Sequence, residues 1–361
     1  MKRIVCFTES LSGGGAEHQL AILANLLAEN GYDVSFVTYS DSPDHYQLTK
    51  SITRVNLSDR KSAIGRLFSV LLYFLKVKTD CVISYRQACN ARVIIPLLFR
   101  SKKKINLICG ERNTHYGKSD KYEKFLFGGA YKRANYIVAN SFTQKDYINT
   151  IRPRWSNKVY TIINYTDLNK YSIVKLPPYK DCFRIGIFSR VGLQKNVKNF
   201  IIAMNNLKNE TSKKFEVHWY GNVESDCPYK QWAEEYKTGE YLFFHSAVKD
   251  TRLFMGQFNA ICQPSLFEGF SNSISEAICC GMPMLVGDVS DNSIMVKDGI
   301  NGYLFNPTEV QSIVSSFLKI FLLDDNQLEQ FGKESRVIAE SLFDKEVFVS
   351  SYTKLIENEP V

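Results

Sequence analysis

Two pairs of charged residues in the second half of the chain have the spacing of a binding site. Arg190 and Lys195 lie five residues apart in the segment SRVGLQKN, and Glu268 and Glu276 enclose seven residues in the segment PSLFEGFSNSISEA. Cations near a helix N-terminus can hold a diphosphate, because charge and free amide groups both attract anions. Carboxylates accept hydrogen bonds from hydroxyl groups. The four residues therefore predict a ligand that carries a diphosphate and hydroxyl groups; ordinary surface charges are the alternative for the two cations.

The segment around the two glutamates predicts a buried strand, a glycine-containing turn and a helix. The apolar run 260–263 comes first, and the backbone amides of Gly269, Phe270 and Ser271 follow it as a cradle for an anion or a hydroxyl group. Ser273 and Glu276 also have the spacing of a capping box, in which the two side chains bond the first turn of a helix. Spacing alone leaves both interpretations open.

Three consecutive glycines stand between the first expected strand and the first expected helix. Without side chains, the backbone at Gly13, Gly14 and Gly15 can approach an anion closely, and the helix that follows offers free amide groups. The pattern is neither G-x-G-x-x-G nor G-x-x-x-x-G-K-[ST], which argues against an NAD-binding fingerprint and a P-loop. The segment predicts a phosphate-facing loop, with a flexible turn as the alternative.

A third group of polar residues follows a strand expected near residues 104–109. The segment CGERNTH contains Glu111, Arg112 and His115. Ligands of open parallel sheets bind at the carboxyl ends of the strands, so all three residues are candidates for contact with the reacting part of a substrate. A structural role is the alternative for the histidine.

Short β-branched runs alternate with segments of helical period along the chain, including one helix expected over 119–133. The segment 165–181 has no period and contains two consecutive prolines, which predicts a linker. The alternation then restarts. We therefore expect the α/β class with two Rossmann-like domains, each a parallel sheet covered by helices, over 1–170 and 171–343. A last segment, 344–361, carries a helix that we expect to return to the first domain.

The composition is that of a folded globular protein and excludes several other classes. Of the 361 residues, 45% are hydrophobic and 23% are charged, which argues against long disorder. No apolar run approaches the roughly 20 residues that span a bilayer, and we interpret the N-terminus MKRIVCF as a strand and not as a signal peptide. Nine scattered cysteines without a C-x-x-C pattern predict buried thiols in a reducing cytoplasm.

The positive charge is concentrated in the first half of the chain. Residues 1–175 contain 27 Lys and Arg against 13 Asp and Glu, whereas residues 176–361 contain 18 against 24. Basic clusters at 76–78 and 100–104 adjoin apolar segments. This mixture fits an anionic membrane surface better than a nucleic-acid groove. Solvated helix ends are the alternative.

In their order along the chain, these segments resemble family 4 glycosyltransferases, which are retaining enzymes with the GT-B fold of two Rossmann-like domains across a cleft. The resemblance covers nearly the whole chain. The enzymes that it resembles are of the kind used in bacterial O-antigen, capsule or exopolysaccharide assembly, lipopolysaccharide included. Its strongest part is the E-x7-E element from Glu268 to Glu276. The other segments are GGGAE at 13–17, VANS at 138–141, IINYTD at 162–167, SRVGLQKN at 189–196 and DGINGYLFNP at 298–307.

The resemblance also implies a role for each site residue. Arg190 and Lys195 match the pair that neutralises the donor diphosphate, Glu268 the residue that holds hydroxyls of the transferred sugar, and Glu276 the residue that binds the ribose. The glycine loop at Gly14 and Gly15 and the turn at Gly269, Phe270, Ser271 and Asn272 match the donor-binding loops. Many relatives have a Gly-Gly-x-x-Glu turn after the strand expected at 283–287, whereas this chain has DVSDNS at 288–293 and no glutamate there. The contact that relatives make at this turn is therefore not carried over to this chain.

The function implied is transfer of a sugar, with retention, from a nucleoside diphosphate sugar to a saccharide acceptor. UDP is preferred over GDP, the acceptor is expected on a polyprenyl diphosphate, and no cofactor, metal or nucleic acid is expected. The catalytic residues would be Glu268, Arg190, Lys195 and His115, with Glu111 and Arg112 on the acceptor side. The protein would be cytoplasmic, at the inner face of the plasma membrane.

Three other functions compete with this interpretation. A nucleotide-sugar 2-epimerase on the same fold would also bind a diphosphate between two domains, but it needs acid–base groups around C2 of the sugar. A non-enzymatic protein that binds nucleic acid or another anion would use the basic half, although no recognition motif is present. An NAD enzyme is disfavoured by the glycine loop.

Overall fold

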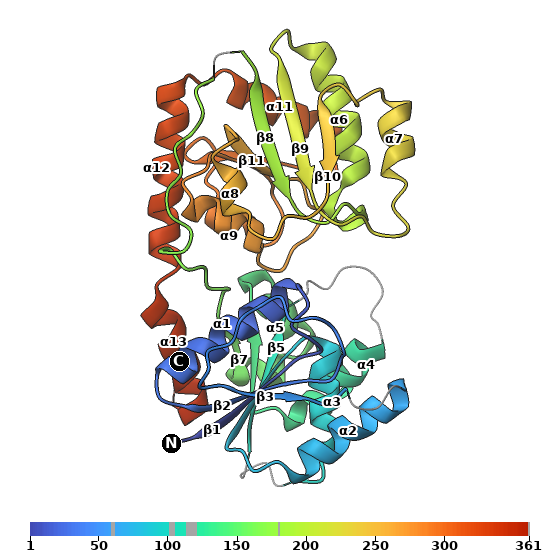
Figure 1. Ribbon diagram of the computed structural model, residues 1–361, viewed down its shortest axis with the longest axis vertical. Helices are drawn as coiled ribbons and strands as arrows, with labels where there is room; N and C mark the ends of the chain where they lie inside the picture. The colour runs from blue at the N-terminus through green and yellow to red at the C-terminus, as the bar shows by residue number, and fades with distance from the viewer. Residues whose placement is uncertain (59–61, 101–104, 113–120, 180, 360–361) are drawn as a thin grey trace. The chain divides into compact units, whose positions relative to one another are not determined.

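The computed structural model describes residues 1–58, 62–100, 105–112, 121–179 and 181–359, and it divides the chain into two compact units (Figure 1). The first unit is Met1–Tyr165 together with Lys345–Val361, and the second is Thr166–Asp344. Each unit is built around its own parallel sheet. The chain therefore passes from one unit to the other twice, after Tyr165 and after Asp344.

The first unit contains a seven-stranded parallel sheet among its described residues, in the order β3-β2-β1-β4-β5-β6-β7. Its strands are β1 (Arg3–Phe7), β2 (Asp33–Thr38), β3 (Thr53–Asn56), β4 (Cys81–Tyr85), β5 (Asn106–Glu111), β6 (Tyr136–Ala139) and β7 (Val159–Thr161). The order reverses between β1 and β4, where Ile4 pairs with Val34 on one side and with Cys81 on the other. Ligands of such sheets bind outside the carboxyl ends of the strands at this reversal.

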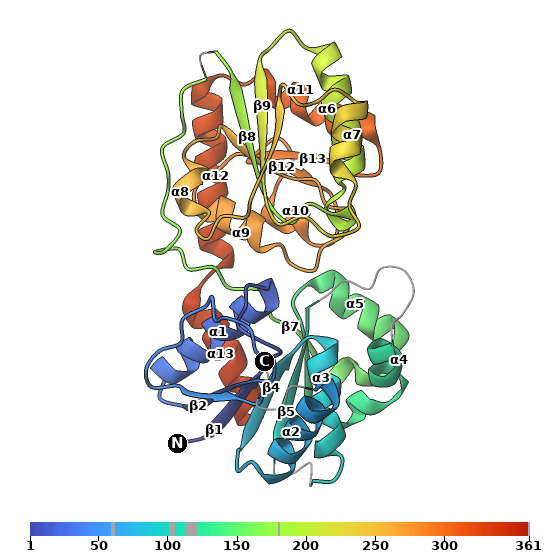
Figure 2. The ribbon, with the colours of Figure 1, turned by 45° about the vertical axis from the view of Figure 1, so that its right-hand side comes forward.

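Helices cover both faces of the first sheet, with α2, α3 and α4 together on one side and α1 with α13 on the other (Figure 2). Their bounds are α1 (Gly15–Glu29), α2 (Ala63–Lys76), α3 (Gln87–Leu97), α4 (Lys121–Gly128), α5 (Phe142–Ile151) and α13 (Lys345–Glu357). Phe7, Phe74 and Ile94 join strand and helices in one buried cluster. Both faces of the parallel sheet are covered, so its central strands β4 and β5 are buried along their whole length.

The second unit repeats the plan with six parallel strands in the order β10-β9-β8-β11-β12-β13. The strands are β8 (Phe183–Phe188), β9 (Phe215–Tyr220), β10 (Leu242–His245), β11 (Ala260–Gln263), β12 (Met284–Gly287) and β13 (Gly302–Phe305). The helices are α6 (Val197–Glu210), α7 (Tyr229–Glu235), α8 (Arg252–Met255), α9 (Asn272–Cys279), α10 (Asn292–Met295), α11 (Val310–Phe321) and α12 (Asp325–Leu342). The strand order reverses between β8 and β11, which again marks the expected binding edge.

The last helix, α13, belongs to the first unit and is held there by buried polar contacts. The hydroxyls of Tyr352 and Tyr85 lie 2.7 Å apart, and the Asn106 amide donates to the Leu355 carbonyl at 2.7 Å. Leu355 and Ile356 are buried beside these contacts. The apolar face of α13 thus closes one side of the first sheet, although it is encoded at the other end of the sequence.

The structure differs from the expected elements at three places. The helix expected over 119–133 ends at Gly128 in its described part, and a 3-10 turn over Ala130–Arg133 follows, because Gly129 has a φ of 150° that a continuing helix does not allow. The short elements α10 and β13 were not expected from the pattern. Each spans only four residues, too few to show a period.

Among the described residues, none of the helices combines the length and apolar character that crossing a bilayer requires. All nine cysteines are free thiols, and only Cys182 is not buried. Burial raises the pKa of the Cys109 thiol to about 12, which keeps it protonated and unreactive at neutral pH.

Candidate functional site

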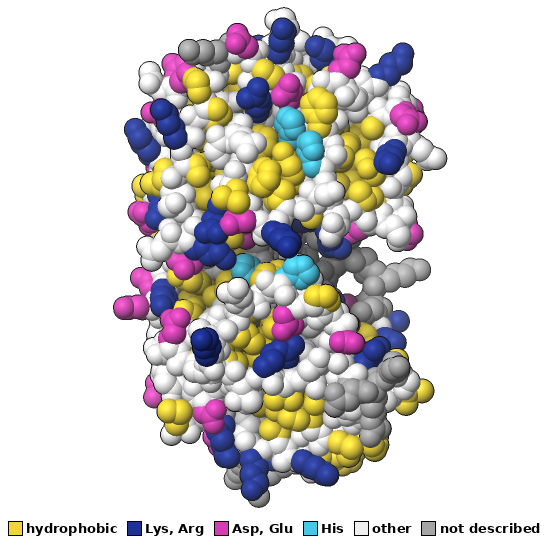
Figure 3. Space-filling view, viewed as in Figure 1, with side chains coloured by type: hydrophobic (Ala, Val, Ile, Leu, Met, Phe, Trp, Pro, Cys, Tyr) yellow, Lys and Arg dark blue, Asp and Glu magenta, His cyan; other side chains and the backbone are white. Residues whose placement is uncertain are grey.

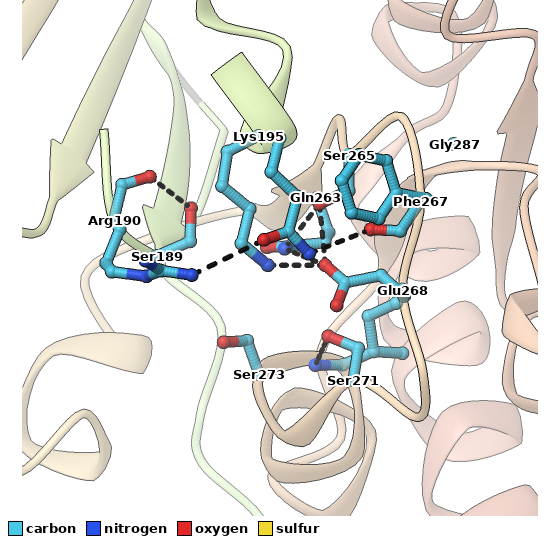
Figure 4. A network of polar contacts seen from close by, with 12 residues as sticks. Ser189, Arg190, Lys195, Gln263, Ser265, Phe267, Glu268, Ser271, Ser273 and Gly287 are labelled. Atoms are coloured by element: carbon cyan, nitrogen blue, oxygen red, sulfur yellow. Dashed lines mark hydrogen bonds and ion pairs between the residues drawn. The ribbon is translucent and has the colours of Figure 1, made fainter. Parts of the chain in front are cut away.

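Three loops meet at the carboxyl edge of the second sheet, after β8, β11 and β12. The Leu266 amide donates to the Gln194 carbonyl at 2.9 Å, and the Gln194 side chain donates to the Phe267 carbonyl at 3.1 Å (Figure 4). The Ser290 hydroxyl donates to the Glu268 carbonyl at 2.6 Å, from a backbone position with a φ of 50°. The segment 288–293 after β12 thus braces the loop that carries Glu268.

Lys195 and Glu268 form an ion pair within this network, and both side chains are largely buried (Figure 4). The same carboxylate oxygen, Oε1, accepts from the Ser265 hydroxyl at 2.7 Å and from the Gln263 amide at 3.0 Å. Burial alone would raise the pKa of Glu268, but the Lys195 ammonium and these hydrogen bonds outweigh it and lower the pKa. Glu268 is therefore a charged carboxylate held in a fixed orientation at neutral pH.

Arg190 lies in the same loop as Lys195 but in a more open position. Its side chain is 60% exposed, and Nη1 donates to Glu224 Oε1 at 2.8 Å. Nη2 donates to the Gln194 side chain at 3.3 Å, which links Arg190 to the Lys195–Glu268 network. The structure thus brings the two predicted cations to one loop, one buried against its carboxylate and one accessible.

Close backbone packing fixes this loop. The indole of Trp219 donates to the Ser189 carbonyl at 2.9 Å, directly before Arg190. A Cβ atom at Gly221 would lie 1.8 Å from that same carbonyl oxygen, so no other residue fits there. The position of Arg190 therefore depends on the end of β9 as well as on its own strand.

Helix α9 begins at this edge and carries the second glutamate. Ser271 is its N-cap and accepts from the Ile274 amide at 3.5 Å, and Asn272 is its first residue. The alternative interpretation, a capping box of Ser273 and Glu276, does not hold, because Ser273 lies inside the helix and donates to the Phe188 carbonyl at 2.6 Å. Gly269 and the buried Phe270 precede the helix, so the N-terminus of α9 follows directly on the loop that carries Glu268.

Glu276 lies in the second turn of α9 and is half-buried. The Thr251 hydroxyl donates to its Oε2 at 3.0 Å, and the Tyr171 hydroxyl is a second partner. Burial raises the pKa of Glu276, and the hydrogen bonds oppose the rise. Glu276 is thus a second carboxylate near this edge, carried by the helix that begins four residues after Glu268.

The glycine loop of the first unit lies at the carboxyl end of β1. Gly14 is the N-cap of α1, Gly15 is its first residue, and both are exposed. The buried Glu17 accepts from Arg86 at 2.7 Å, and its carboxylate lies against Gly14, where a Cβ atom would be 2.0 Å from Oε2. The start of α1 is therefore open to solvent and already has one carboxylate beside it.

Glu111 and Arg112 are both buried in the first unit. Glu111 accepts from the Gln87 amide at 2.9 Å and from the Tyr131 hydroxyl, and burial raises its pKa to about 8. Arg112 donates to the Tyr352 hydroxyl at 2.6 Å, and its guanidinium stacks 3.7 Å from the centre of the Tyr85 ring. These contacts give both residues a structural part, and their acceptor role stays a prediction. His115 lies outside the described residues.

Sequence reasoning did not single out Glu224, Thr251 or Arg86. Arg86 follows β4 directly and has a φ of 78°, which is unusual for a side chain of its size. Its signal in the sequence was a cation at the end of a buried strand, the same signal that pointed to Arg190. Glu224 and Thr251 had no such signal, because their partners, Arg190 and Glu276, lie 34 and 25 residues away along the chain.

A family model described as "Glycosyl transferases group 1" matches residues 172–337, which hold Arg190, Lys195, Glu268 and Glu276. An uncharacterized glycosyltransferase of Methanocaldococcus jannaschii is 22% identical over 243 residues, 65% of this chain and 62% of that protein. The UDP-Gal:alpha-D-GlcNAc-diphosphoundecaprenol alpha-1,3-galactosyltransferase of Escherichia coli is 30% identical over 73 residues, 20% of this chain and 18% of that enzyme. The matches thus span less than two thirds of these relatives.

The structure is also similar to solved structures along its whole length. The Anabaena protein HepE, solved in complex with UDP and glucose, has a TM-score of 0.81 and 16% identity, with 99% of this chain and 100% of that chain covered. An identity this low shows a shared fold. The expected arrangement of two Rossmann-like domains is confirmed.

Proposed function

Because residues 172–337 belong to group 1 of the glycosyl transferases and the chain has the GT-B fold, we propose that the protein transfers a hexosyl group from a nucleoside diphosphate sugar to a saccharide acceptor. We further propose UDP as the nucleotide, with GDP as the alternative, and retention at the anomeric carbon. The observation that carries the proposal is the shared network of Arg190, Lys195 and Glu268 at the carboxyl edge of the second sheet.

The donor would lie along this edge, with each part against a residue of matching chemistry. The exposed guanidinium of Arg190 and the ammonium of Lys195 attract the diphosphate, and the positive end of the α9 helix dipole adds to this attraction. Glu268 accepts hydrogen bonds from hydroxyls of the transferred sugar. Glu276, one helical turn further along, accepts from the ribose hydroxyls.

In the transfer step, the bond between C1 of the sugar and the diphosphate oxygen breaks. A bond from C1 to the acceptor hydroxyl oxygen forms on the same face of the ring. The hydroxyl proton passes to the departing phosphate oxygen, and the nucleoside diphosphate leaves. Negative charge grows on that oxygen, so fixed cations lower the barrier, by about 3 kcal/mol for each well-placed group in a dry site.

For the acceptor, we propose a saccharide on a polyprenyl diphosphate at the inner face of the plasma membrane. Two observations support this choice: the Escherichia coli relative is named for a diphosphoundecaprenol acceptor, and the first half of the chain is strongly basic. A basic surface near the membrane favours an acceptor that carries a diphosphate.

Thermal unfolding with UDP, GDP and their sugars tests donor binding directly. A ligand that binds only the folded protein raises its melting temperature, and the rise grows with the logarithm of the ligand concentration divided by Kd. We expect a rise with UDP and UDP-sugars that is lost in the Lys195→Ala variant and kept in Lys198→Ala, which changes the next cation along the chain. The absence of a rise with every nucleotide would exclude the proposed donor site.

A second measurement separates transfer from epimerisation. The protein is incubated with UDP-sugars, with and without an undecaprenyl-diphosphate saccharide, and the products are followed by proton NMR. We expect a new glycosidic bond with the anomeric configuration of the donor, only with the acceptor. A C2 epimer formed without acceptor would establish the isomerase instead, and binding without any turnover would favour a non-enzymatic protein.

A further inference from the structure

A pocket of about 460 Å³ lies in the second unit, between the turn before β13 and the first turns of α12. Sites for small molecules have volumes of roughly 300–1,000 Å³. The apolar part of the lining consists of Ile300, Tyr303, Leu323 and Phe331, and Ile300 is 50% exposed. Apolar side chains that stay open to water at a pocket indicate a binding surface.

The rings of Tyr303 and Phe331 form a corner in this pocket. Their centroids are 5.7 Å apart, and their planes are tilted by 55°. Phe331 is only 9% exposed, so packing fixes its position, whereas Tyr303 is half-buried. The corner can therefore contact one face and one edge of a small ring-shaped ligand.

The polar part of the lining comes from one face of α12. Gln327, Gln330 and Glu334 follow the helical spacing of three and four residues. The side-chain carbonyl of Gln327 accepts from the Asp324 amide at 2.9 Å, which leaves the Gln327 amide nitrogen to donate to a ligand. Gln330 donates to Glu334 Oε1 at 2.8 Å, which leaves its own carbonyl and Glu334 Oε2 to accept. The pocket thus presents donors and acceptors side by side in fixed orientations.

The pocket is separate from the proposed donor site. Tyr303 is the second residue of β13, whereas Phe305 ends this strand and accepts from the Asp288 amide at 2.8 Å. Asp288 begins the segment 288–293, which braces the loop that carries Glu268. A ligand in the pocket therefore lies at the opposite end of β13 from the Lys195–Glu268 network.

We propose that this pocket binds one pyranose ring of a neutral saccharide. A pyranose has an apolar face of C–H groups, which fits the corner of the two aromatic rings. The hydroxyl groups around its edge each donate and accept a hydrogen bond, as the side chains of α12 require. The ligand then satisfies both the apolar and the polar parts of the lining at once.

The charges around the pocket argue against other classes of ligand. Among the lining residues, Glu334 alone carries a formal charge, and it repels phosphates and carboxylates. An organic cation would suit the carboxylate and the rings, but the Lys319 ammonium lies 5.5 Å from the centre of the Tyr303 ring and opposes a second cation there. A lipid chain would leave the two glutamine amides without hydrogen-bond partners.

Under the proposed function, the bound ring belongs to the saccharide that the protein extends. A second contact away from the reacting end raises the effective concentration of that saccharide at the protein. This role rests on the proposed function, whereas the binding itself does not. It can therefore be measured without a donor and without turnover.

Saturation-transfer difference NMR with maltose, cellobiose and N,N′-diacetylchitobiose tests the binding. We expect signals from at least one of these neutral disaccharides. Tyr303→Ala should bind it on the order of tenfold more weakly, because half of the aromatic corner is lost. Lys195→Ala, which changes the donor site, should bind it like the wild type. No signal with any of the three would overturn the proposal, and loss in Lys195→Ala would move the saccharide to the donor site. Binding without any sugar transfer would overturn the proposed function and leave the pocket in place.

The face of the second unit drawn in Figure 3 supplies the matched control. Hydrophobic side chains gather there around the two histidines of β9 and β10. Phe243 stacks on His218, with ring centroids 5.1 Å apart, and is half-buried, as Tyr303 is. Phe243→Ala should bind the disaccharide like the wild type. Equal loss in Phe243→Ala and Tyr303→Ala would overturn the assignment to the pocket.

Two charged probes test the class of ligand. Glucuronate should bind more weakly than glucose, and Glu334→Gln should reduce this difference, because the repulsion between two carboxylates is removed. Glucuronate that binds more tightly than glucose would overturn the assignment of a neutral ligand. Saturation transfer to choline that disappears in Tyr303→Ala would make the pocket a site for organic cations instead.

Discussion

Glu111 and Glu268 are buried glutamates at the carboxyl edges of the two parallel sheets, yet their surroundings differ in one respect. Glu268 faces the ammonium of Lys195, whereas the partners of Glu111 are the amides of Gln87 and Asn90 and the hydroxyl of Tyr131. Burial raises the pKa of Glu111 to about 8, and the lysine lowers the pKa of Glu268 in spite of burial. Position at a sheet edge therefore does not by itself give a carboxylate that can serve a substrate.

The sharpest test of this comparison replaces each glutamate by its neutral isostere. Glu268→Gln should lower kcat by about 10²- to 10³-fold, because a fixed charge next to the reacting sugar is lost. Glu111→Gln should leave kcat within about twofold, since the carboxyl is already largely uncharged and lies inside the unit. Initial rates with a UDP-sugar and acceptor give both values.

Retained affinity for UDP serves as the folding control in both variants, because the proposed nucleotide site includes residues other than the two that are replaced. Equal loss of activity in the two variants would remove the distinction drawn between the two carboxyl groups. A loss confined to Glu111→Gln would move the reacting group to the first unit.

Stability as a function of pH gives the next largest effect. The folded pKa of Glu111 is above the unfolded value, so the folded state holds a proton that the unfolded state releases between about pH 4.5 and 8. Stability from this group is complete below that range and falls as the pH rises, by up to about 1.4 kcal/mol per pH unit. Between pH 5 and 7, Glu111→Gln should become more stable relative to the wild type by as much as about 2.7 kcal/mol.

Glu268 should have the opposite dependence. Its folded pKa is below the unfolded value, so its contribution is present above the unfolded pKa and is lost as the pH falls through the folded pKa. Urea unfolding of the wild type and the two Gln variants at several pH values measures both slopes. Parallel curves for wild type and Glu111→Gln would mean that Glu111 is ionised in the folded protein.

The same two glutamates illustrate what could be predicted from the sequence. The alternation of β-branched runs and helical periods predicted both parallel sheets, and the E-x7-E spacing placed Glu268 and Glu276 on one strand–turn–helix unit. Burial was not predictable in the same way. Glu111 ends a strand and Glu268 follows one, but Glu111 is enclosed by tertiary packing, which brings side chains of α3 and the Tyr131 hydroxyl against it. The pairing of Arg190 with Glu224 and the pocket beside α12 are likewise consequences of packing, and local pattern does not contain them.

Glu276 should have a smaller effect than Glu268, confined to nucleotide binding. Glu276→Ala removes a carboxylate that would accept from the ribose hydroxyls, and a hydrogen bond to a charged group is worth about 1.5–3 kcal/mol. We therefore expect at least roughly tenfold weaker binding of UDP by calorimetry. Glu334→Ala, which removes a carboxylate that is also half-buried but lies on α12, is the control and should bind UDP normally. Unchanged affinity in Glu276→Ala would remove the ribose from this part of the site.

The smallest expected effect concerns Glu224, the carboxylate that would compete with the proposed donor for Arg190. Glu224 holds Arg190 at 2.8 Å, and its carboxylate lies over Gly192, where a Cβ atom would be 2.1 Å from Oε2. A diphosphate that binds Arg190 must replace this contact, so Glu224→Gln should lower the KM for the donor and leave kcat unchanged. An exposed ion pair is worth about 0.2–1 kcal/mol, which limits the gain to about fivefold.

Arg184 and Glu216 supply the matched control, as an exposed ion pair of 3.3 Å on the neighbouring strands β8 and β9. Glu216→Gln should leave the KM unchanged, and higher salt should reduce the difference between Glu224→Gln and the wild type. A raised KM in Glu224→Gln would mean that the glutamate orients Arg190 toward the diphosphate and does not compete with it. In that case a carboxylate would orient each of the two cations of the site: Glu268 holds Lys195 in the interior, and Glu224 holds Arg190 at the surface.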